Sequence, residues 1–347
     1  MPGRSYASRI GFAEVPRLIM VPPDSITLAK RIQRSTGRTF HLTTRVLPER
    51  VRHPTYVLYG FFRLADQVVD DTDPLPPTEQ AALLTEYEQS ALGNRETNHP
   101  VLNAMADLVD RHAIDEREIT EFIDAMRADI EPTPFARYRD LEEYLRGSAV
   151  AVAYMMLKVM NPPQLEAARP HARALGEAFQ LTNFLRDVRE DSLQYDRLYL
   201  PLETLEAHGV SPEEIHSLRF SEGVARVIET ELDRTEDRYR VGVEGIKYLP
   251  ADCRFAVLLA AVFYAEYHRM IASQGYDVLT KQPSFTRRRY AVLFIRTWFA
   301  WKRHDDPATV FYRVSPIDPP TEGAHQDTTS SGLTSVIKEH ILPSSSD

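Results

Sequence analysis

The chain has 347 residues, of which 43% are hydrophobic and 26% charged, which is the composition of a soluble globular protein and not of a disordered or membrane-spanning one. Its formal net charge of −9 argues against a nucleic-acid partner, because phosphate backbones are bound by clusters of Lys and Arg. The single Cys253 has no partner for an internal disulfide, which favours a reducing cytoplasm.

Residues 1–24 are predicted to be an N-terminal extension. Charged residues, among them Arg4, Arg9 and Glu14, interrupt the apolar core that a signal peptide would need. The longest uncharged apolar run, Phe255–Ala265, is well short of the roughly 20 residues of a spanning helix and is predicted to be a buried helix. We therefore expect a cytoplasmic protein.

Apolar residues recur at intervals of three and four through the middle of the chain, which predicts helices and no strands. The expected helices are Ser25–Arg34, Pro54–Asp71, Pro77–Ala91, Pro100–Ala113, Glu116–Ile130, Leu141–Met160, Pro170–Asp191, Pro212–Leu218, Glu222–Tyr248, Cys253–Ser273 and Arg287–Trp301. No linker or repeat divides them, so the fold class is all-α, a single large helical domain over residues 25–304. Pro, Ser, Thr and Asp are frequent from Asp305 onward, which predicts a mobile C-terminal tail over 305–347.

The first candidate motif is the acidic segment Tyr59–Asp71. Asp66 and Asp70 are four residues apart, which places both carboxylates on one helix face, where they repel each other. Arg63 lies one turn earlier on much the same face and offsets part of that repulsion. The flanking residues are apolar and indicate burial, which is costly for a carboxylate without a cation or a donor. A solvated helix end before a turn would give the same pattern.

The second motif is Gln180–Asp191, in which Asn183, Asp187 and Asp191 follow at steps of four residues. This spacing forms a ladder of oxygen ligands on one helix face. Mg²⁺ is usually held by one or two carboxylates together with phosphate oxygens, so two such helices facing each other would hold a diphosphate through bridging ions. The alternative is a surface helix whose Arg and Glu side chains form local ion pairs.

Together these motifs resemble the squalene/phytoene synthase family. Tyr59–Asp71 is similar to the first aspartate motif of that family, and Gln180–Asp191 followed by Asp196–Pro201 is similar to the second. Shorter similarities lie around Thr39 and Phe40 and in Gly275–Val278. The resemblance spans about 35–301 and implies an all-α fold of the isoprenoid synthase type with a central cavity.

The resemblance also implies the residues of the site. Metal ligands for Mg²⁺, or for Mn²⁺ in its place, are expected at Asp66, Asp70, Asn183, Asp187 and Asp191. Catalytic roles are expected for Asp66, Asp70, Asp187, Asp191 and Tyr264. Substrate contacts are expected from Phe40, Tyr59, Arg63, Arg146, Gln180, Arg186, Arg197, Tyr199 and Arg288.

The chain departs from the family's pattern at one position of the predicted site. Arg146, in Tyr144–Ala149, stands where family members commonly have a tyrosine, so the usual hydroxyl is missing. Tyr264 or Tyr59 would then supply a hydroxyl nearby, while Arg146 would contact the diphosphate. Asp129 is predicted to lie in the same cavity, although a solvated helix face would explain it equally well.

The resemblance implies that two prenyl diphosphates are joined head to head, through a cyclopropylcarbinyl diphosphate. The Gln180–Asn183 and Arg197–Pro201 sequences favour two geranylgeranyl diphosphates, prephytoene diphosphate as the intermediate and phytoene as the product. The alternative is squalene or dehydrosqualene from two farnesyl diphosphates. A second alternative is a non-catalytic relative that acts as an assembly protein, although such relatives tend to lose carboxylates that are complete here. Only squalene formation needs a hydride, so NADPH is not expected, and the greasy product suggests peripheral contact with a membrane.

Overall fold

The computed structural model describes residues 38–71 and 73–320, and within these ranges every regular element is a helix. This confirms the all-α prediction. The predicted helix Ser25–Arg34 and the N-terminal extension lie outside the described residues. The elements are α2 (Arg38–Thr44), α3 (Glu49–Val69), α4 (Pro77–Ala91), α5 (Pro100–His112), α6 (Glu116–Ala128), α7 (Tyr138–Leu145), the π-helix η3 (Arg146–Ala151), α8 (Val152–Met160), α9 (Leu165–Gln194), α10 (Leu202–Ala207), α11 (Pro212–His216), α12 (Glu222–Glu244), the 3₁₀-helix η4 (Gly245–Tyr248), α13 (Ala251–Ser273), α14 (Arg287–Arg303) and α15 (Pro307–Val314).

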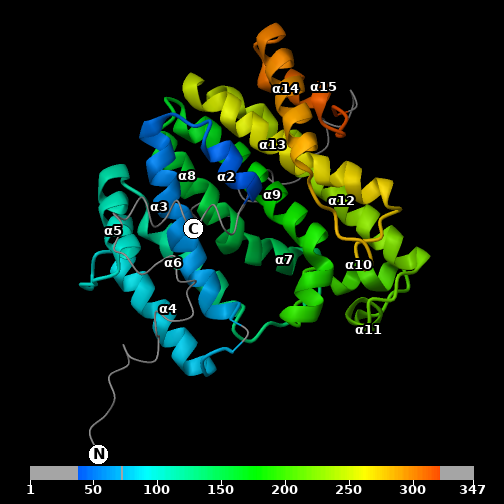
Figure 1. Ribbon diagram of the computed structural model, residues 1–347. Coiled ribbons are helices and arrows are strands. Elements are labelled where there is room, and N and C mark those ends of the chain that lie inside the picture. Colours follow the sequence, from blue (N-terminus) through cyan, green and yellow to red (C-terminus); the bar gives the residue numbers. More distant parts are fainter. Residues whose placement is uncertain (1–37, 72, 321–347) are drawn as a thin grey trace, which may run out of the picture.

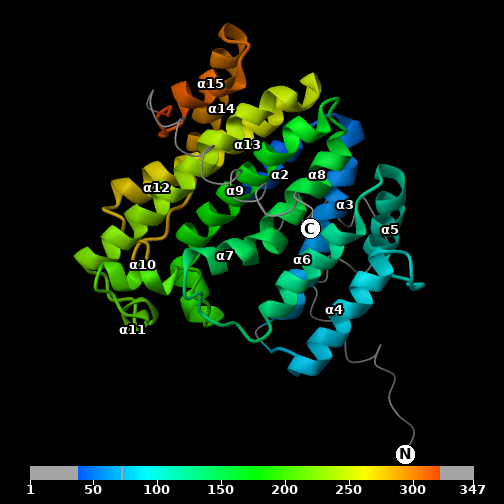
Figure 2. The same ribbon diagram turned by 180° about the vertical axis from the view of Figure 1, so that it is seen from behind.

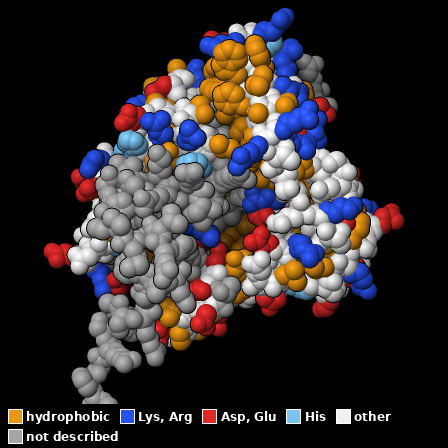
Figure 3. Space-filling view, viewed as in Figure 1, with side chains coloured by type: hydrophobic (Ala, Val, Ile, Leu, Met, Phe, Trp, Pro, Cys, Tyr) orange, Lys and Arg blue, Asp and Glu red, His pale blue; other side chains and the backbone are white. Residues whose placement is uncertain are grey.

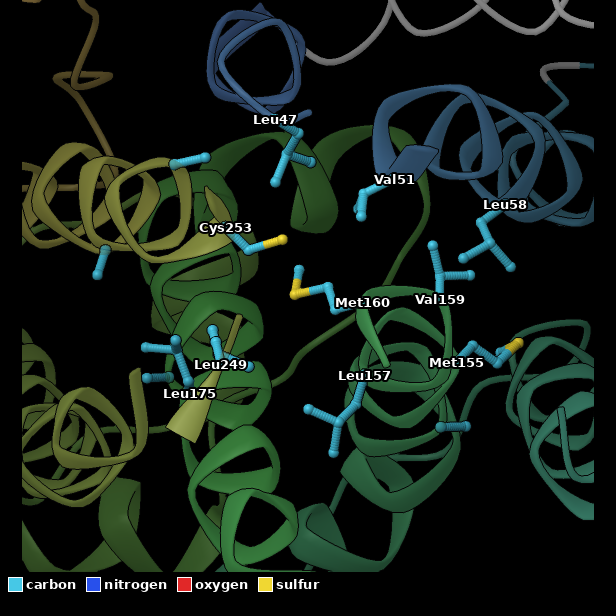
Figure 4. Packing of buried hydrophobic residues seen from close by; sticks show 14 of the residues in the cluster. Leu47, Val51, Leu58, Met155, Leu157, Val159, Met160, Leu175, Leu249 and Cys253 are labelled. Atoms are coloured by element: carbon cyan, nitrogen blue, oxygen red, sulfur yellow. The ribbon is translucent and has the colours of Figure 1, made fainter. Parts of the chain in front are cut away.

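The long helix α9 is the centre of the molecule (Figures 1 and 2). Helices α8, α12 and α13 pack directly against it, and α3 packs on α8. Apolar residues from α3, α8, α9 and α13 converge in one large core, which Figure 4 shows around Met160, Leu175 and Cys253. A central helix surrounded by others in this way can expose one of its faces to an interior space.

Helices α3 and α9 each begin five residues earlier than predicted. Pro54 and Pro170 were expected to start helices, because proline fits the first turn, but both lie inside α3 and α9, which begin at Glu49 and Leu165. Each proline is the sixth residue of its helix and removes a single backbone hydrogen bond near the end. The preceding turns are retained because they bury Val51 and Ala168 in the core.

The predicted helix Leu141–Met160 is interrupted by the π-helix η3. Gly147 permits close packing of η3 on α6, since a Cβ atom at this position would lie 2.2 Å from the carbonyl oxygen of Glu121. Short π-helical segments are frequent at functional sites. The widened turn changes which side chains η3 and α8 direct toward α9.

The prediction that Phe255–Ala265 is buried is confirmed. By length and composition alone α13 could cross a membrane, but 78% of its apolar window is buried inside the protein. It is therefore the core helix of this fold in the described part of the chain. Its neighbours are α2, α9, α12, η4, α14 and α15.

The predicted mobile tail is wrong in its first part. Residues 307–314 form α15, which Asp306 caps by accepting a hydrogen bond from the Thr309 amide at 2.8 Å. Phe311 is fully buried and stacks on Tyr239 with ring centroids 5.8 Å apart. The polar composition after Asp305 concealed a short amphipathic helix, and the remaining tail beyond 320 lies outside the described residues.

Replacing Phe311 with Ala is expected to lower the free energy of unfolding by about 3–5 kcal/mol, because the change removes a fully buried aromatic side chain. Urea denaturation followed by circular dichroism would measure it. Arg313→Ala, on the exposed side of the same helix, is the control and should change stability by less than about 0.5 kcal/mol. Equal stabilities of the two variants would contradict the packing of α15.

Candidate functional site

A single elongated cavity of about 850 Å³ extends beside α9. Its walls come from α3, η3, α8, α9 and α13, with α2 and the segment 282–290 at one side. Along α9 the lining residues run from Ala168 to Asp191. One helix therefore forms both ends of the cavity, and the chemistry changes from one end to the other.

The two acidic motifs meet at the polar end. Asp66 and Asp70 of α3 and Asn183, Asp187 and Asp191 of α9 all line the same cavity. The prediction that the two helices face each other across a shared space is therefore confirmed. This arrangement does not support the two alternatives, a solvated helix end for the first motif and a surface helix for the second.

Three arginines neutralise part of this acidic cluster. Arg197 donates to the Asp70 carboxylate at 2.7 Å and to the backbone carbonyl oxygens of Val69 and Asp129. Arg63 lies 3.5 Å from Asp66 and 3.8 Å from Asp70, between the two acids. Arg186 forms a bidentate pair with its neighbour, Asp187. Acids and arginines thus alternate, as a site for both cations and phosphate oxygens requires.

The carboxylates with least compensation hold protons at neutral pH. Burial raises the pKa of Asp191 to about 8, and repulsion from Asp187 adds to the shift. Burial also raises the pKa of Asp66 to about 7, against the opposing effect of Arg63. The Asp66 side chain is 35% exposed, but the exposed part faces the cavity, which is lined by protein. A bound cation would reverse both shifts.

Thirteen of the predicted site residues line the cavity. They are Phe40, Tyr59, Arg63, Asp66, Asp70, Gln180, Asn183, Arg186, Asp187, Asp191, Arg197, Tyr199 and Tyr264. Asp129 also lines it, and its carboxylate accepts hydrogen bonds from the hydroxyl groups of Tyr144 at 2.7 Å and Tyr199 at 3.4 Å. Burial raises the pKa of Asp129 to about 6. The roles assigned to these residues remain predictions.

Arg146 and Arg288 do not line the cavity. The Arg146 guanidinium lies 2.9 Å from the buried Glu118 and 3.7 Å from Glu121, both on α6. It therefore holds η3 against α6, which contradicts the prediction that it binds the diphosphate. Arg288 is exposed on α14. The hydroxyl predicted to be missing near Arg146 is instead available from Tyr144, which lies two residues earlier and lines the cavity.

Several lining residues were not predicted. Tyr267 follows Tyr264 by three residues on α13, and its ring lies 5.0 Å from the Arg186 guanidinium carbon. The i, i+3 spacing of the two tyrosines was the available signal. Tyr290 at the start of α14 stacks on Phe285 and is hydrogen-bonded to Thr39 of α2 at 2.6 Å. This contact joins two chain segments 251 residues apart, which no local pattern could reveal.

The other end of the cavity is apolar. Its lining includes Leu47, Leu157, Met160, Leu249 and Ala256, whose packing is partly visible in Figure 4. On α9 the lining residues there are Ala168, His171, Ala172, Leu175 and Gly176, most of them small or apolar. Fifteen residues separate Ala168 from Asn183 along α9, a distance of roughly 22 Å at 1.5 Å per residue. The cavity is long and narrow. One end carries acidic and basic side chains, and the other end is apolar.

The polar end fits a hard divalent cation such as Mg²⁺. All the candidate ligands are oxygens, and Asn183 Oδ1 is buried without a hydrogen-bond partner in the described structure. In residues 38–71 and 73–320, no group of three or more His, Cys, Asp or Glu side chains is close enough to hold a metal ion alone. A cation here would need further oxygens, and the phosphate oxygens of a substrate are suitable.

A comparison with known protein families identifies the family of this chain. The squalene/phytoene synthase family model matches residues 33–289. The chain belongs to the squalene/phytoene synthase family. The phytoene synthase of Rhodobacter capsulatus is 31% identical over 277 residues, which cover 78% of this chain and 80% of the relative. The phytoene synthase of Cereibacter sphaeroides is 30% identical over 285 residues and 79% of each chain.

Solved structures of the squalene/phytoene synthase family agree with the fold. A dehydrosqualene synthase in complex with a ligand superposes with a TM-score of 0.71 at 25% identity, covering 81% of this chain and 97% of that one. A squalene synthase from Alicyclobacillus acidocaldarius superposes with a TM-score of 0.65 at 24% identity, covering 73% and 95%. The fold is that of the isoprenoid synthases and the chain is a prenyltransferase. This family acts on prenyl diphosphates.

Binding of Mg²⁺ and pyrophosphate is expected to release protons near pH 7, because a cation lowers the raised pKa values of Asp66 and Asp191. The apparent affinity should rise as the pH increases from 6 to 8. Without the metal, the free energy of unfolding should fall as the pH rises from 6 to 8. The folded state binds protons on these carboxylates that the unfolded state does not, and it loses them as the pH passes the raised folded-state pKa values. Calorimetry in two buffers of different ionisation enthalpy measures the release.

The matched control for this linkage is Asp107→Asn, which neutralises an exposed acid on α5 and should leave proton release unchanged. Asp191→Asn should reduce it. Equal release by the two variants would show that the protons come from elsewhere.

Proposed function

We propose that this prenyltransferase is a phytoene synthase, which condenses two geranylgeranyl diphosphates head to head (1′-1) through prephytoene diphosphate. The observation that carries the proposal is the shape of the cavity, with acids and arginines at one end and a mostly apolar lining along the roughly 22 Å of α9 from Asn183 to Ala168. Such a space suits a diphosphate with a long hydrocarbon tail. The names of the relatives at 31% and 30% identity support the C20 substrate.

The arginines of the polar end would bind the departing diphosphate. Arg63 Nε and Arg197 Nε are buried and have no hydrogen-bond partner among the described residues. As the carbon–oxygen bond breaks, negative charge grows on the leaving oxygens, and preorganised donors stabilise it. Mg²⁺ held by Asp66, Asp70, Asn183, Asp187 and Asp191 would supply charge neutralisation of the leaving group; Mn²⁺ is proposed as a substitute.

The aromatic residues between the two ends suit an allylic carbocation. The Phe184 and Tyr199 rings are stacked, with centroids 3.9 Å apart, beside the Tyr144 ring. Aromatic faces attract cations, and the apolar walls of α8 and α13 keep water from quenching them. Asp129 lies within the hydrogen-bonding reach of both tyrosines and fixes their hydroxyl groups.

The proposed reaction has two halves. In the first, one diphosphate leaves, the double bond of the second substrate attacks the resulting cation, and loss of a proton closes the cyclopropane ring of prephytoene diphosphate. In the second, the remaining diphosphate leaves, the carbon skeleton rearranges, and loss of a second proton gives phytoene. No hydride is consumed, so NADPH is not proposed.

The second candidate is a C15 enzyme that forms squalene or dehydrosqualene from two farnesyl diphosphates. The specific observation in its favour is the structural match to a dehydrosqualene synthase at 25% identity. The same polar end would serve both substrates. The depth of the apolar end therefore decides between the two candidates.

Purified protein with Mg²⁺ and geranylgeranyl diphosphate is expected to form a C40 hydrocarbon without NADPH, because each half of the reaction releases one diphosphate and one proton and consumes no hydride. Mass spectrometry of the extracted hydrocarbon identifies the product. Farnesyl diphosphate with and without NADPH is the parallel incubation. A C30 product and no C40 product would replace the proposal with the second candidate.

Ala172→Phe is expected to lower turnover of the C20 substrate by at least about tenfold relative to the C15 substrate, because the added ring fills the apolar end beside α9. Competition between the two diphosphates in one incubation measures this ratio. Ala167→Phe, at an exposed position on the same helix, is the control and should leave the ratio unchanged. A C20 preference that survives Ala172→Phe would show that the tail does not occupy this end.

A further inference from the structure

Helix α14 carries an exposed apolar face outside the cavity. Tyr290, Leu293 and Thr297 form its buried stripe, while the large side chains on the opposite side are exposed. The exposed set comprises Val292 at 46%, Phe294 at 38%, Ile295 at 52%, Trp298 at 41% and Phe299 at 63%. Figure 3 shows hydrophobic side chains gathered at the top of the molecule, where α14 projects from the body in Figure 1. We call these five residues the α14 patch.

The same helix is strongly basic. Its sequence contains six Lys and Arg residues and no Asp or Glu, although the whole chain has a net charge of −9. Arg289 is taken up internally by the buried Glu266 of α13, at 2.6 Å. The others are exposed and form no ion pair with a described residue: Arg287, Arg288, Arg296, Lys302 and Arg303. Apolar side chains bordered by basic ones are typical of helices that lie in the surface of a bilayer.

The N-terminal end of α14, on its buried side, adjoins the cavity. Tyr290, at the start of α14, lines the cavity together with Phe285, and the two rings are stacked with centroids 4.4 Å apart. The ion pair between Arg289 and Glu266 fixes the helix to α13 at this point.

We propose that the α14 patch docks the protein onto an anionic lipid bilayer. The apolar side chains would enter the acyl boundary while the five exposed cations meet the acidic headgroups. The charge selects this partner over a second copy of the chain, because a two-fold contact of α14 with itself would bring the two sets of cations together. The assignment goes beyond the proposed reaction and can fail independently of it.

Flotation of the full-length chain with vesicles tests the proposal. Binding is expected with phosphatidylcholine vesicles that contain phosphatidylglycerol, to fall with added salt, and to be weak with phosphatidylcholine alone. Ile295→Ser should lower the partition coefficient about tenfold, since a half-exposed aliphatic side chain is lost. Val241→Ser removes an aliphatic side chain of 48% exposure on α12 and is the matched control, with no expected change.

The charge requirement has its own pair of variants. Arg296→Gln combined with Arg303→Gln should lower the partition coefficient about thirtyfold, and the same double neutralisation of the exposed Arg111 and Arg139 should not. Circular dichroism and turnover in detergent should stay at the original values in all variants, which separates docking from folding and from catalysis.

Three results would overturn the assignment. The first is a chain that does not float with anionic vesicles. The second is flotation that Ile295→Ser leaves intact. The third is sedimentation showing a dimer that Ile295→Ser converts to a monomer, because the patch would then be a contact between copies. If the patch bound a protein instead of lipid, the purified chain would float with the vesicles only after that protein was added, which would also contradict the assignment.

Discussion

The structure depends on the burial of like charges between two helices. Asp66 and Asp70 of α3 face Asp187 and Asp191 of α9 inside one cavity, where carboxylates are costly to ionise. The protein compensates in part, with Arg63, Arg186 and Arg197, and leaves the rest as raised pKa values. If the arginines neutralised every carboxylate, the site would lose its affinity for a cation. If no arginine were present, repulsion between the carboxylates would separate the helices. The incomplete balance is what makes this end a binding site.

The helix α9 makes that balance useful, because it extends from the acids to the greasy end without a break. Its residues change from Asn and Asp to Ala and Gly over the same face. A diphosphate held at the acids therefore has its tail directed along the helix. The interior Pro170 does not interrupt this, because it lies near the start, where only one backbone hydrogen bond is lost.

Features with a local period could be predicted from the sequence. The four-residue steps of the two ladders determine a shared helix face whatever the tertiary structure, and the structure places both ladders in the lining of one cavity. Arg146 was misplaced because its partners, Glu118 and Glu121, lie on α6 and are chosen by tertiary packing. The helix α15 was missed because its composition resembles a tail, while its burial depends on Tyr239 of a distant helix. Similarly, the Thr39–Tyr290 contact has no local signature.

The charges of the chain are distributed by task. Buried glutamates on α6, α9, α12 and α13 each pair with an arginine, and the pairs of Glu118, Glu177 and Glu266 join one helix to another. Glu266 takes Arg289 from α14 in this way but leaves the other cations of that helix exposed beside apolar residues. An exposed basic helix on an acidic protein is not needed for solubility, and the exposed aromatic side chains of this helix lower solubility. Its arrangement is explained by a surface that is itself acidic and apolar.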